Sequence, residues 1–404
     1  MQFQKKALST FVTGIVVATM AATVASTASA TTDGKVKIGV LADMGGTYAD
    51  LCGPGCVTAT RMAIEDFGGK ALGKDIELIS ADSQLKPDIA SSVARKWVEN
   101  EGVDVIGGLV SSAVTGAVTQ VTNSSKNITL ITGSGSNAFT SSACSPYIAH
   151  WTYNVVALAN GTVKPMVSEG KNKWFFITAD YVFGHALEAA SMKIIEANGG
   201  ETVGTVRAPL GTTDFSSYVL QAQASGANVV ALANAGNDTV NALSAAAEFG
   251  LTDYMDIAGL LVFTPNAQAM DPDTAQGMRL TTGFYWDMDE QTRAWSARFE
   301  ALHGAIPSMS HAGAYSATMH YLKAVEAVGT DDSDAVMKQM KLTKPDDFFA
   351  RNATLRADGR MEHDMLLVEI KKASERKSKN DIYNIVEVIP GNKAYNPMLP
   401  SCAF

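Results

Sequence analysis

The sequence lacks the patterns that mark the common catalytic and metal centres. None of its six histidines stands in an HExxH pair or at another helical metal-ligand spacing, and there is neither a G-x-S-x-G elbow nor a Walker loop. If the four cysteines pair, no thiol is left for catalysis. We therefore expect a protein that is not an enzyme and that holds no metal ion and no cofactor.

Cysteine is scarce, and its even number suits an oxidising compartment. Three pairings are possible. Cys52 and Cys56 flank the turn-forming residues 53–55, which could bring the two sulfur atoms within bonding distance. That pairing leaves Cys144 with Cys402, a long-range bond that would tie the C-terminal tail to the middle of the chain and stabilise the fold by about 3 to 5 kcal/mol.

Long apolar runs are also missing, except at the N-terminus. Lys5 and Lys6 precede an apolar stretch over 11–22, and residues 28–30 read Ala-Ser-Ala, the small-x-small pattern that a signal peptidase accepts. No other segment reaches the ~20 residues that span a bilayer. We expect an exported protein cleaved after Ala30, and a retained membrane anchor is the alternative.

The charge balance is acidic. The predicted signal carries two lysines and no carboxylate, so its removal changes the formal charge from -9 to about -11 (-9 minus 2). This charge argues against nucleic acid and against an anionic membrane surface as partners.

The remaining sequence alternates regularly between strand and helix patterns. Its first strand, which starts near Lys35, is almost uninterruptedly apolar and ends in a Gly-rich turn, as in a parallel strand buried on both faces. This alternation predicts an α/β fold with doubly wound parallel sheets, whose ligands lie at the carboxyl ends of the strands. The expected strands are 76–81, 103–107, 128–132, 173–178, 202–206, 229–233, 365–370 and 383–389, and the expected helices are 58–67, 89–99, 113–122, 157–168, 184–198, 216–225, 239–249, 290–302 and 313–328.

Two late helices decide the predicted division into lobes. Helices 290–302 and 313–328 follow the second set of strands and have no sheet of their own to cover. We expect the chain to cross back to the first lobe near Trp286 and to return to the second near Gly359. The expected parts are a signal peptide over 1–30, lobe 1 over 31–150 plus 287–359, and lobe 2 over 151–286 plus 360–404.

Acidic residues are absent from 105–168, where two loops follow predicted strands. Ser111 and Ser112 precede a helix, where hydroxyls, free amides and the positive end of the helix dipole favour an anion. The alternative is that one serine is only the N-cap. Residues 133–138 match a loose GxGxxA pattern, but the acid that a dinucleotide site needs about 20 positions later is missing. This loop contributes the candidates Gly133, Ser134 and Ser136.

The second lobe offers candidates at two more strand ends. Tyr181 and Phe183 could stack on a ring or cover an aliphatic chain, and packing beneath their own loop is the alternative. Asn234, Ala235 and Asp238 follow another strand, although Asp238 could instead cap the next helix.

Three further aromatic residues stand at positions where two lobes would meet. Tyr285 and Trp286 lie at the predicted crossover, and Tyr48 lies in the loop after the first strand. Each could present a ring to a ligand, and sealing the lobe interface is the alternative.

The chain resembles the type I periplasmic binding proteins of ABC importers, in the branch of the Leu/Ile/Val-binding protein and related aromatic-acid receptors. The likeness covers nearly all of the mature chain and is carried by VKIGVLADMGGTYADLCGPG, RKWVENEGVDVIGGLVSSAV, WFFITADYVFG, GFYWDMDEQTRAW and RADGRMEHDM. It implies two Rossmann-like lobes, joined by a three-segment hinge, that close on a small-molecule ligand. It also implies a periplasmic monomer that delivers this ligand to an ABC permease in the inner membrane.

The resemblance also bears on the ligand. The serines at 111–112 match the position of the family's carboxylate-binding serine, and Phe183 takes the place of a ligand-contacting tyrosine. Ala157 stands where the amino-acid receptors have an aspartate for the ammonium group, and an unpaired buried ammonium is costly. We therefore expect a small carboxylate, aromatic ones included, unless Asp238 supplies the whole counter-charge.

Other functions are compatible with the same residues. Within the class, the alternative is a branched-chain or other hydrophobic amino acid, or an amide. Outside it, the alternatives are a periplasmic ligand-sensing domain and an enzyme with a dispersed triad.

Overall fold

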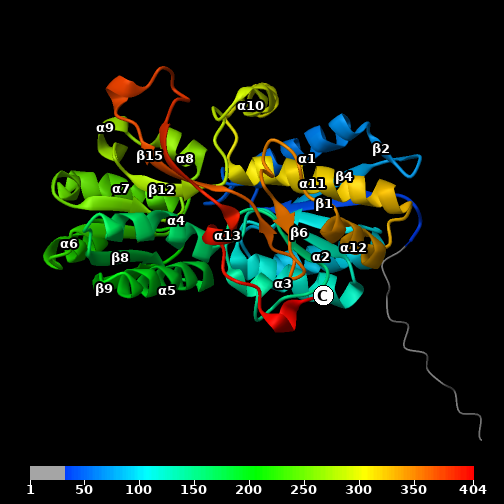
Figure 1. The fold of residues 1–404 in the computed structure, drawn as a ribbon, viewed down its shortest axis with the longest axis horizontal. Helices are drawn as coiled ribbons and strands as arrows, with labels where there is room; N and C mark the ends of the chain where they lie inside the picture. Colours follow the sequence, from blue (N-terminus) through cyan, green and yellow to red (C-terminus); the bar gives the residue numbers. More distant parts are fainter. Residues whose placement is uncertain (1–31) are drawn as a thin grey trace, which may run out of the picture.

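The computed structural model describes residues 32–404, and the predicted signal peptide lies outside this range. Two sheets lie side by side, and each has helices packed on both of its faces (Figure 1). The first sheet has the order β4-β1-β5-β6-β7, and all its pairs are parallel. Its strands are β1 (Lys37–Ala42), β4 (Glu77–Asp82), β5 (Val105–Gly108), β6 (Ile128–Ile131) and β7 (Ile148–His150).

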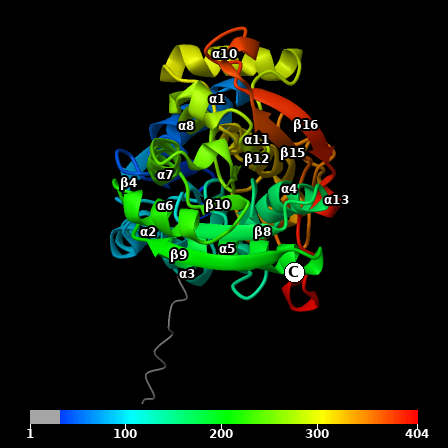
Figure 2. The same ribbon diagram turned by 90° about the vertical axis from the view of Figure 1, so that its left-hand side faces the viewer.

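The second sheet has seven strands in the order β16-β15-β12-β11-β10-β8-β9 (Figure 2). The part from β12 to β9 is parallel, while β15 and β16 are added antiparallel. Its strands are β8 (Lys173–Ala179), β9 (Glu201–Ala208), β10 (Val229–Ala233), β11 (Asp256–Gly259), β12 (Arg279–Thr282), β15 (Met365–Ile370) and β16 (Tyr383–Ile389). Two small hairpins complete the strands: β2 (Lys70–Ala71) with β3 (Lys74–Asp75), and β13 (Thr354–Leu355) with β14 (Met361–Glu362).

The helices cover the faces of both sheets. Those associated with the first sheet are α1 (Gly53–Phe67), α2 (Pro87–Asn100), α3 (Ser112–Ser125), α10 (Glu290–His303), α11 (Met309–Val328) and α12 (Ser333–Leu342). Those associated with the second are α4 (Val155–Ser168), α5 (Val182–Ala197), α6 (Ser216–Ala224), α7 (Asn237–Glu248), α8 (Thr264–Ala269), α9 (Pro272–Ala275) and α13 (Gly391–Ala394). Within residues 32–404, no helix is long and apolar enough to cross a membrane.

The strands at the centre of the first sheet are buried on both faces, which accounts for their composition. Residues 38–42 of β1 and all of β5 and β6 are buried, because helices pack on both faces. Their sequences are accordingly apolar except for Thr129, whose hydroxyl is hydrogen-bonded to that of Thr122. Gly39 in β1 leaves room for the Trp97 ring of α2, which would lie 2.5 Å from a Cβ atom at this position. On α2, Ala90, Ala94 and Trp97 are buried and Val93 is partly buried against the same cluster, as the helical spacing of these four residues predicts.

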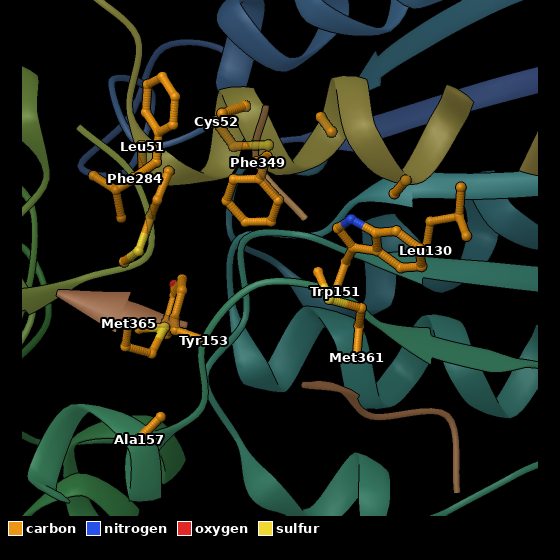
Figure 3. Packing of buried hydrophobic residues seen from close by; sticks show 14 of the residues in the cluster. Leu51, Cys52, Leu130, Trp151, Tyr153, Ala157, Phe284, Phe349, Met361 and Met365 are labelled. Atoms are coloured by element: carbon orange, nitrogen blue, oxygen red, sulfur yellow. The ribbon is translucent and has the colours of Figure 1, made fainter. Parts of the chain in front are cut away.

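The chain passes between the sheets after β7, after β12 and after β14, and its C-terminal tail then returns to the first lobe, where Cys402 is bonded to Cys144. The first and third of these crossovers meet at the backbone oxygen of Thr152, which accepts hydrogen bonds from Arg360 Nη2 (2.6 Å) and His363 Nε2 (3.1 Å) and also from Tyr395 Oη of the C-terminal tail (2.9 Å). Figure 3 shows the apolar residues around them, with Trp151 beside Leu130 and Met361. One buried cluster therefore continues from the first lobe into the second.

Both expected disulfides are present, Cys52–Cys56 and Cys144–Cys402. The prediction of a turn over residues 53–55 was wrong, because these residues form the first turn of α1 and Cys56 N donates to Cys52 O across it. Pro54 fits there, since the first amides of a helix have no partner within the helix. The cysteines are thus joined across one helical turn, and α1 begins five residues before the predicted start.

Candidate functional site

The loops that follow the strands of one sheet touch the loops that follow the strands of the other. Tyr48 Oη, after β1, lies 2.8 Å from Tyr181 Oη, after β8. Gly236, after β10, packs so closely on the first lobe that a Cβ atom there would lie 2.5 Å from Thr47 O. The two lobes are therefore closed on each other at the carboxyl ends of their parallel strands, the usual ligand position of such sheets.

A tight turn after β1 presents Tyr48 to this interface. The buried Asp43 carboxylate accepts hydrogen bonds from Gly46 N and Tyr48 N, each at 2.9 Å. Tyr48 itself is 1% exposed. Burial raises the pKa of its phenol well above the ordinary value, with smaller contributions from Tyr181 and the Asp238 carboxylate. The phenol is therefore a neutral hydroxyl at physiological pH.

The loop after β5 brings the start of α3 to the lobe interface. Ser111 occupies the N-cap position with an extended backbone and is buried, yet its side chain makes no capping hydrogen bond. Leu109, just before it, adopts a left-handed backbone with φ of 61°, a strained conformation for a bulky residue. Because the first amides of α3 also lack partners within the helix, this helix end can receive an anion.

The loop after β6 lies directly beside this helix end. Ser134 Oγ is 3.0 Å from Ser112 Oγ, and both residues are buried. The backbone oxygens of this loop are already engaged, since Gly133 O accepts from Tyr153 Oη (2.8 Å) and Ser134 O from His150 Nε2 (2.7 Å).

Ser136, from the same loop, has a local role. Its hydroxyl accepts from Ala138 N and caps the short 3-10 helix η1 (Asn137–Thr140). The structure therefore groups Ser112 and Ser134 at the helix end and uses the Ser136 hydroxyl elsewhere.

On the second lobe, the turn from β8 into α5 aims two aromatic rings at the first lobe. Gly184 makes this turn possible, because a Cβ atom there would lie 2.0 Å from Ala179 O. The rings of Tyr181 and Phe183 are 5.9 Å apart, and Phe183 is buried. Phe183 packs on Gly135 of the first lobe, where a Cβ atom would lie 2.9 Å from Phe183 Cε2.

The turn after β10 places polar side chains beside these rings. Asp238 is 2% exposed and accepts two hydrogen bonds from Gly211 N, at 3.1 and 3.2 Å. Burial raises its pKa to about 6, and Asp238 forms no ion pair within the described part of the chain. It does not cap α7, whose N-cap is Gly236.

Asn234 and Ala235 complete this turn, and both are buried. Asn234 Oδ1 accepts from Thr239 Oγ1 at 2.7 Å, whereas its Nδ2 finds no partner in residues 32–404.

Tyr285 and Trp286 are placed differently from these residues. Trp286 Nε1 donates to Asn380 O (2.6 Å), and Tyr285 Oη donates to the same oxygen (3.3 Å) and accepts from Ile382 N (3.0 Å). In the described chain, neither ring is stacked on or hydrogen-bonded to a site candidate outside this pair. The two side chains fasten the segment over 380–383 to the crossover after β12.

The sequence did not indicate two residues that contribute to the interface. Tyr153, in the crossover after β7, holds the loop at Gly133 and packs against Phe263, with ring centroids 5.8 Å apart. Phe263 follows β11, a strand of four residues that was not predicted from the sequence. Tyr153 could have been found as an aromatic residue close to the predicted division between the lobes. Phe263 had no such signal, because the strand before it was not predicted. Within residues 32–404, no group of three or more His, Cys, Asp or Glu is arranged to hold a metal ion.

Comparisons with known proteins agree with this arrangement. A profile described as periplasmic binding protein matches residues 35–376. The crystal structure of a periplasmic binding protein from Burkholderia mallei is 46% identical with a TM-score of 0.88, covering 90% of this chain and 96% of that one. A branched chain amino acid ABC transporter periplasmic ligand-binding protein from Burkholderia xenovorans LB400 is 38% identical with a TM-score of 0.81, covering 90% and 97%. Leu/Ile/Val-binding protein homolog 6 of Brucella melitensis is 24% identical over 356 residues, 84% of this chain and 88% of that protein.

Proposed function

The chain belongs to the periplasmic binding protein family, as a solute-binding protein of the ABC-transporter type, and we propose that it captures a small carboxylate between its two lobes. The family binds solutes and performs no chemistry, so the mechanism to explain is capture and release. The observation that carries the proposed ligand class is at the start of α3, at the lobe interface. Ser111 is buried there, and its side chain makes no capping hydrogen bond to the helix.

Electrostatics support an anion at this end of the site. The partial positive charge of the α3 N-terminus favours a carboxylate. No aspartate or glutamate occurs between residues 105 and 168, the stretch that contains β5, α3 and β6. Hydroxyl groups of Ser111, Ser112 and Ser134 can donate to carboxylate oxygens, and hydrogen bonds to a charged acceptor are stronger than neutral ones.

Closure of the lobes supplies the binding mechanism. The solute binds to one lobe of the open form, and contacts from the other lobe stabilise the closed form. Contacts across the interface include those of Tyr48 with Tyr181, Phe183 with Gly135 and Gly236 with Thr47. Micromolar capture requires about 8 kcal/mol, which a few charge-assisted hydrogen bonds and the burial of apolar surface can supply.

We further propose the cellular setting that this function requires. The precursor is exported to the periplasm and cleaved after Ala30, and the mature protein acts there as a monomer. Its partner is a permease of the inner membrane, which recognises the closed form. The acidic charge and the absence of a spanning helix in residues 32–404 are compatible with this setting.

A hydrophobic amino acid is the second candidate ligand. The Burkholderia xenovorans relative, 38% identical, is described as a branched chain amino acid ABC transporter protein. Asp238 could compensate an ammonium group, because it is buried at the interface and unpaired with a cation in the described chain.

A thermal-shift screen of the mature protein tests the function and separates the two candidates. We expect carboxylates to raise the melting temperature, since a ligand that binds only the folded state stabilises it. Leucine and its des-amino analogue 4-methylpentanoate form the deciding pair. A response to leucine with none to 4-methylpentanoate would reject the carboxylate preference, and no response to any small solute would reject capture itself.

Two matched serine variants locate the anion site. Ser111→Ala should weaken binding of the best carboxylate about tenfold or more, because it removes a hydrogen bond to a charged group. Ser124→Ala, at the exposed far end of the same helix, is the control and should bind as the wild type does. Equal affinities of both variants in calorimetry would contradict the assignment.

A further inference from the structure

The second lobe brings two buried polar groups to the interface that the protein leaves incompletely satisfied. Asp238 is 2% exposed, accepts hydrogen bonds only from the Gly211 amide and meets no cation within residues 32–404. Asn234 is 1% exposed, and its Nδ2 has no partner in the same part of the chain. A buried polar group without a partner is unfavourable, so a ligand that supplies the partners gains affinity.

Both groups belong to the turn that touches the other lobe. They stand on either side of Gly236, whose backbone packs against Thr47 O of the first lobe. A Cβ atom at Gly236 would also lie 3.1 Å from Tyr48 Cδ1, so this turn is close to the contact between Tyr48 and Tyr181. Asp238 and Asn234 are therefore on the second-lobe side of the interface, whereas the proposed carboxylate site is on α3 of the first lobe.

The two groups have complementary chemistry. Burial raises the pKa of Asp238 to about 6, so at pH 7.5 it is mainly an ionised hydrogen-bond acceptor. Asn234 Nδ2 is a donor. We infer that the solute carries, at the end opposite its carboxylate, a neutral hydroxyl or carboxamide group that donates to Asp238 and accepts from Asn234. This inference rests on the proposed capture of a carboxylate.

Other end groups satisfy only part of this arrangement. An ammonium group pairs with Asp238 but has no acceptor for Asn234 Nδ2. A second carboxylate accepts from Asn234 but meets the negative charge of Asp238, and like charges in a buried site repel strongly. A methyl group or a bare ring edge leaves both polar atoms unpartnered.

Two matched probe series at pH 7.5 test the inference by calorimetry on the mature protein. The aromatic series is benzoate, 4-hydroxybenzoate, 4-carbamoylbenzoate, 4-(aminomethyl)benzoate and terephthalate. The aliphatic series is butanoate, 4-hydroxybutanoate, succinamate, 4-aminobutanoate and succinate. In the series that fits the site, we expect the hydroxyl or the carboxamide member to bind at least about tenfold more tightly than the other three members.

Variants identify the residues that set this order. Asp238→Asn keeps the shape of the side chain and removes its charge, so the dicarboxylate should gain at least about tenfold relative to the monocarboxylate. Asn234→Leu should reduce the advantage of the hydroxyl and carboxamide members. Asp180→Asn is the control, because Asp180 follows the neighbouring strand β8 but is half exposed and pairs with His185, and it should leave the order unchanged. The melting temperature of each unliganded variant verifies its folding.

The possible outcomes separate the two proposals. Binding by monocarboxylates or dicarboxylates that equals the hydroxyl and carboxamide members overturns this inference and leaves carboxylate capture intact. An unchanged order of preference in Asp238→Asn, with the variant folded, overturns the assignment to Asp238. Binding by no carboxylate of either series overturns the proposed function together with the inference.

Discussion

Replacing Asp104 by asparagine should make the protein more stable at alkaline pH. Asp104 is 3% exposed in the first lobe, where its Oδ2 accepts from Lys37 N at 2.7 Å. Burial, together with the nearby Asp331 carboxylate, raises its pKa to about 8. An asparagine can keep the bond to Lys37 N through its oxygen and carries no charge to desolvate.

The magnitude follows from proton linkage. With a pKa of about 8 in the folded state and about 3.8 unfolded, Asp104 binds more protons in the folded state between these values. The stability of the wild type therefore falls as pH rises through this range. Between pH 6 and pH 8 the loss from this group is about 2 kcal/mol, and Asp104→Asn removes it.

Urea denaturation monitored by tryptophan fluorescence at pH 6, 7 and 8 measures this effect in the protein with its disulfides intact. The free energy of unfolding of Asp104→Asn minus that of the wild type should increase by about 1–3 kcal/mol from pH 6 to pH 8. Asp75→Asn, at a carboxylate that is 84% exposed, is the control and should give a difference independent of pH. A difference for Asp104→Asn that is equally flat would refute the reasoning.

Three further predictions concern closure, the long disulfide and acid stability. Gly135→Ala puts a Cβ atom 2.9 Å from a ring of the opposite lobe, so it should weaken ligand binding about tenfold or more in calorimetry, whereas Gly116→Ala, in open space on α3, should not. Replacing Cys144 and Cys402 by serine should cost about 3–5 kcal/mol in urea denaturation, because it frees a loop of 258 residues in the unfolded chain, and a loss below 1 kcal/mol would contradict this account. Burial lowers the pKa of His363 to about 4, below its ordinary 6.5. The unfolded chain therefore binds more protons between these values, and the free energy of unfolding falls as pH drops from 6.5 to 4. His363→Gln should make this fall smaller.

The sequence predicted most of the regular elements because their signals are local. The apolar run of β1 and the inward stripe of α2 at Ala90, Ala94 and Trp97 repeat with the periods of a strand and a helix. The missed elements include the strands β7, β11 and β12, of three or four residues each, and the ten-residue helix α12. Short length alone is not the reason, since β5 and β6 also have four residues and were predicted.

Only part of the candidate site could be predicted. The sequence indicates which loops follow the strands, but it does not indicate which distant groups their side chains contact. The loops that carry Tyr48, Ser111 and Tyr181 lie at the lobe interface. Tyr285 and Trp286 were interpreted in the same way, yet their polar atoms bind the backbone at Asn380, almost a hundred residues later. No local pattern distinguishes an aromatic residue that faces a ligand from one that fastens a distant loop.

By itself the sequence determined the α/β class and the family, whereas the structure decided among the three possible pairings of its four cysteines. The sequence also shows that the stretch around α3 contains no acidic residue. The class, the family and this absence can be read from composition, spacing or order along the chain. The tertiary structure alone decided that Tyr48 meets Tyr181, 133 residues away, and that Asp104 and Asp238 are buried beside other acidic groups or phenols. The physical reason is that hydrogen bonding and desolvation depend on which distant segments pack together, and three crossings between two sheets fix that packing.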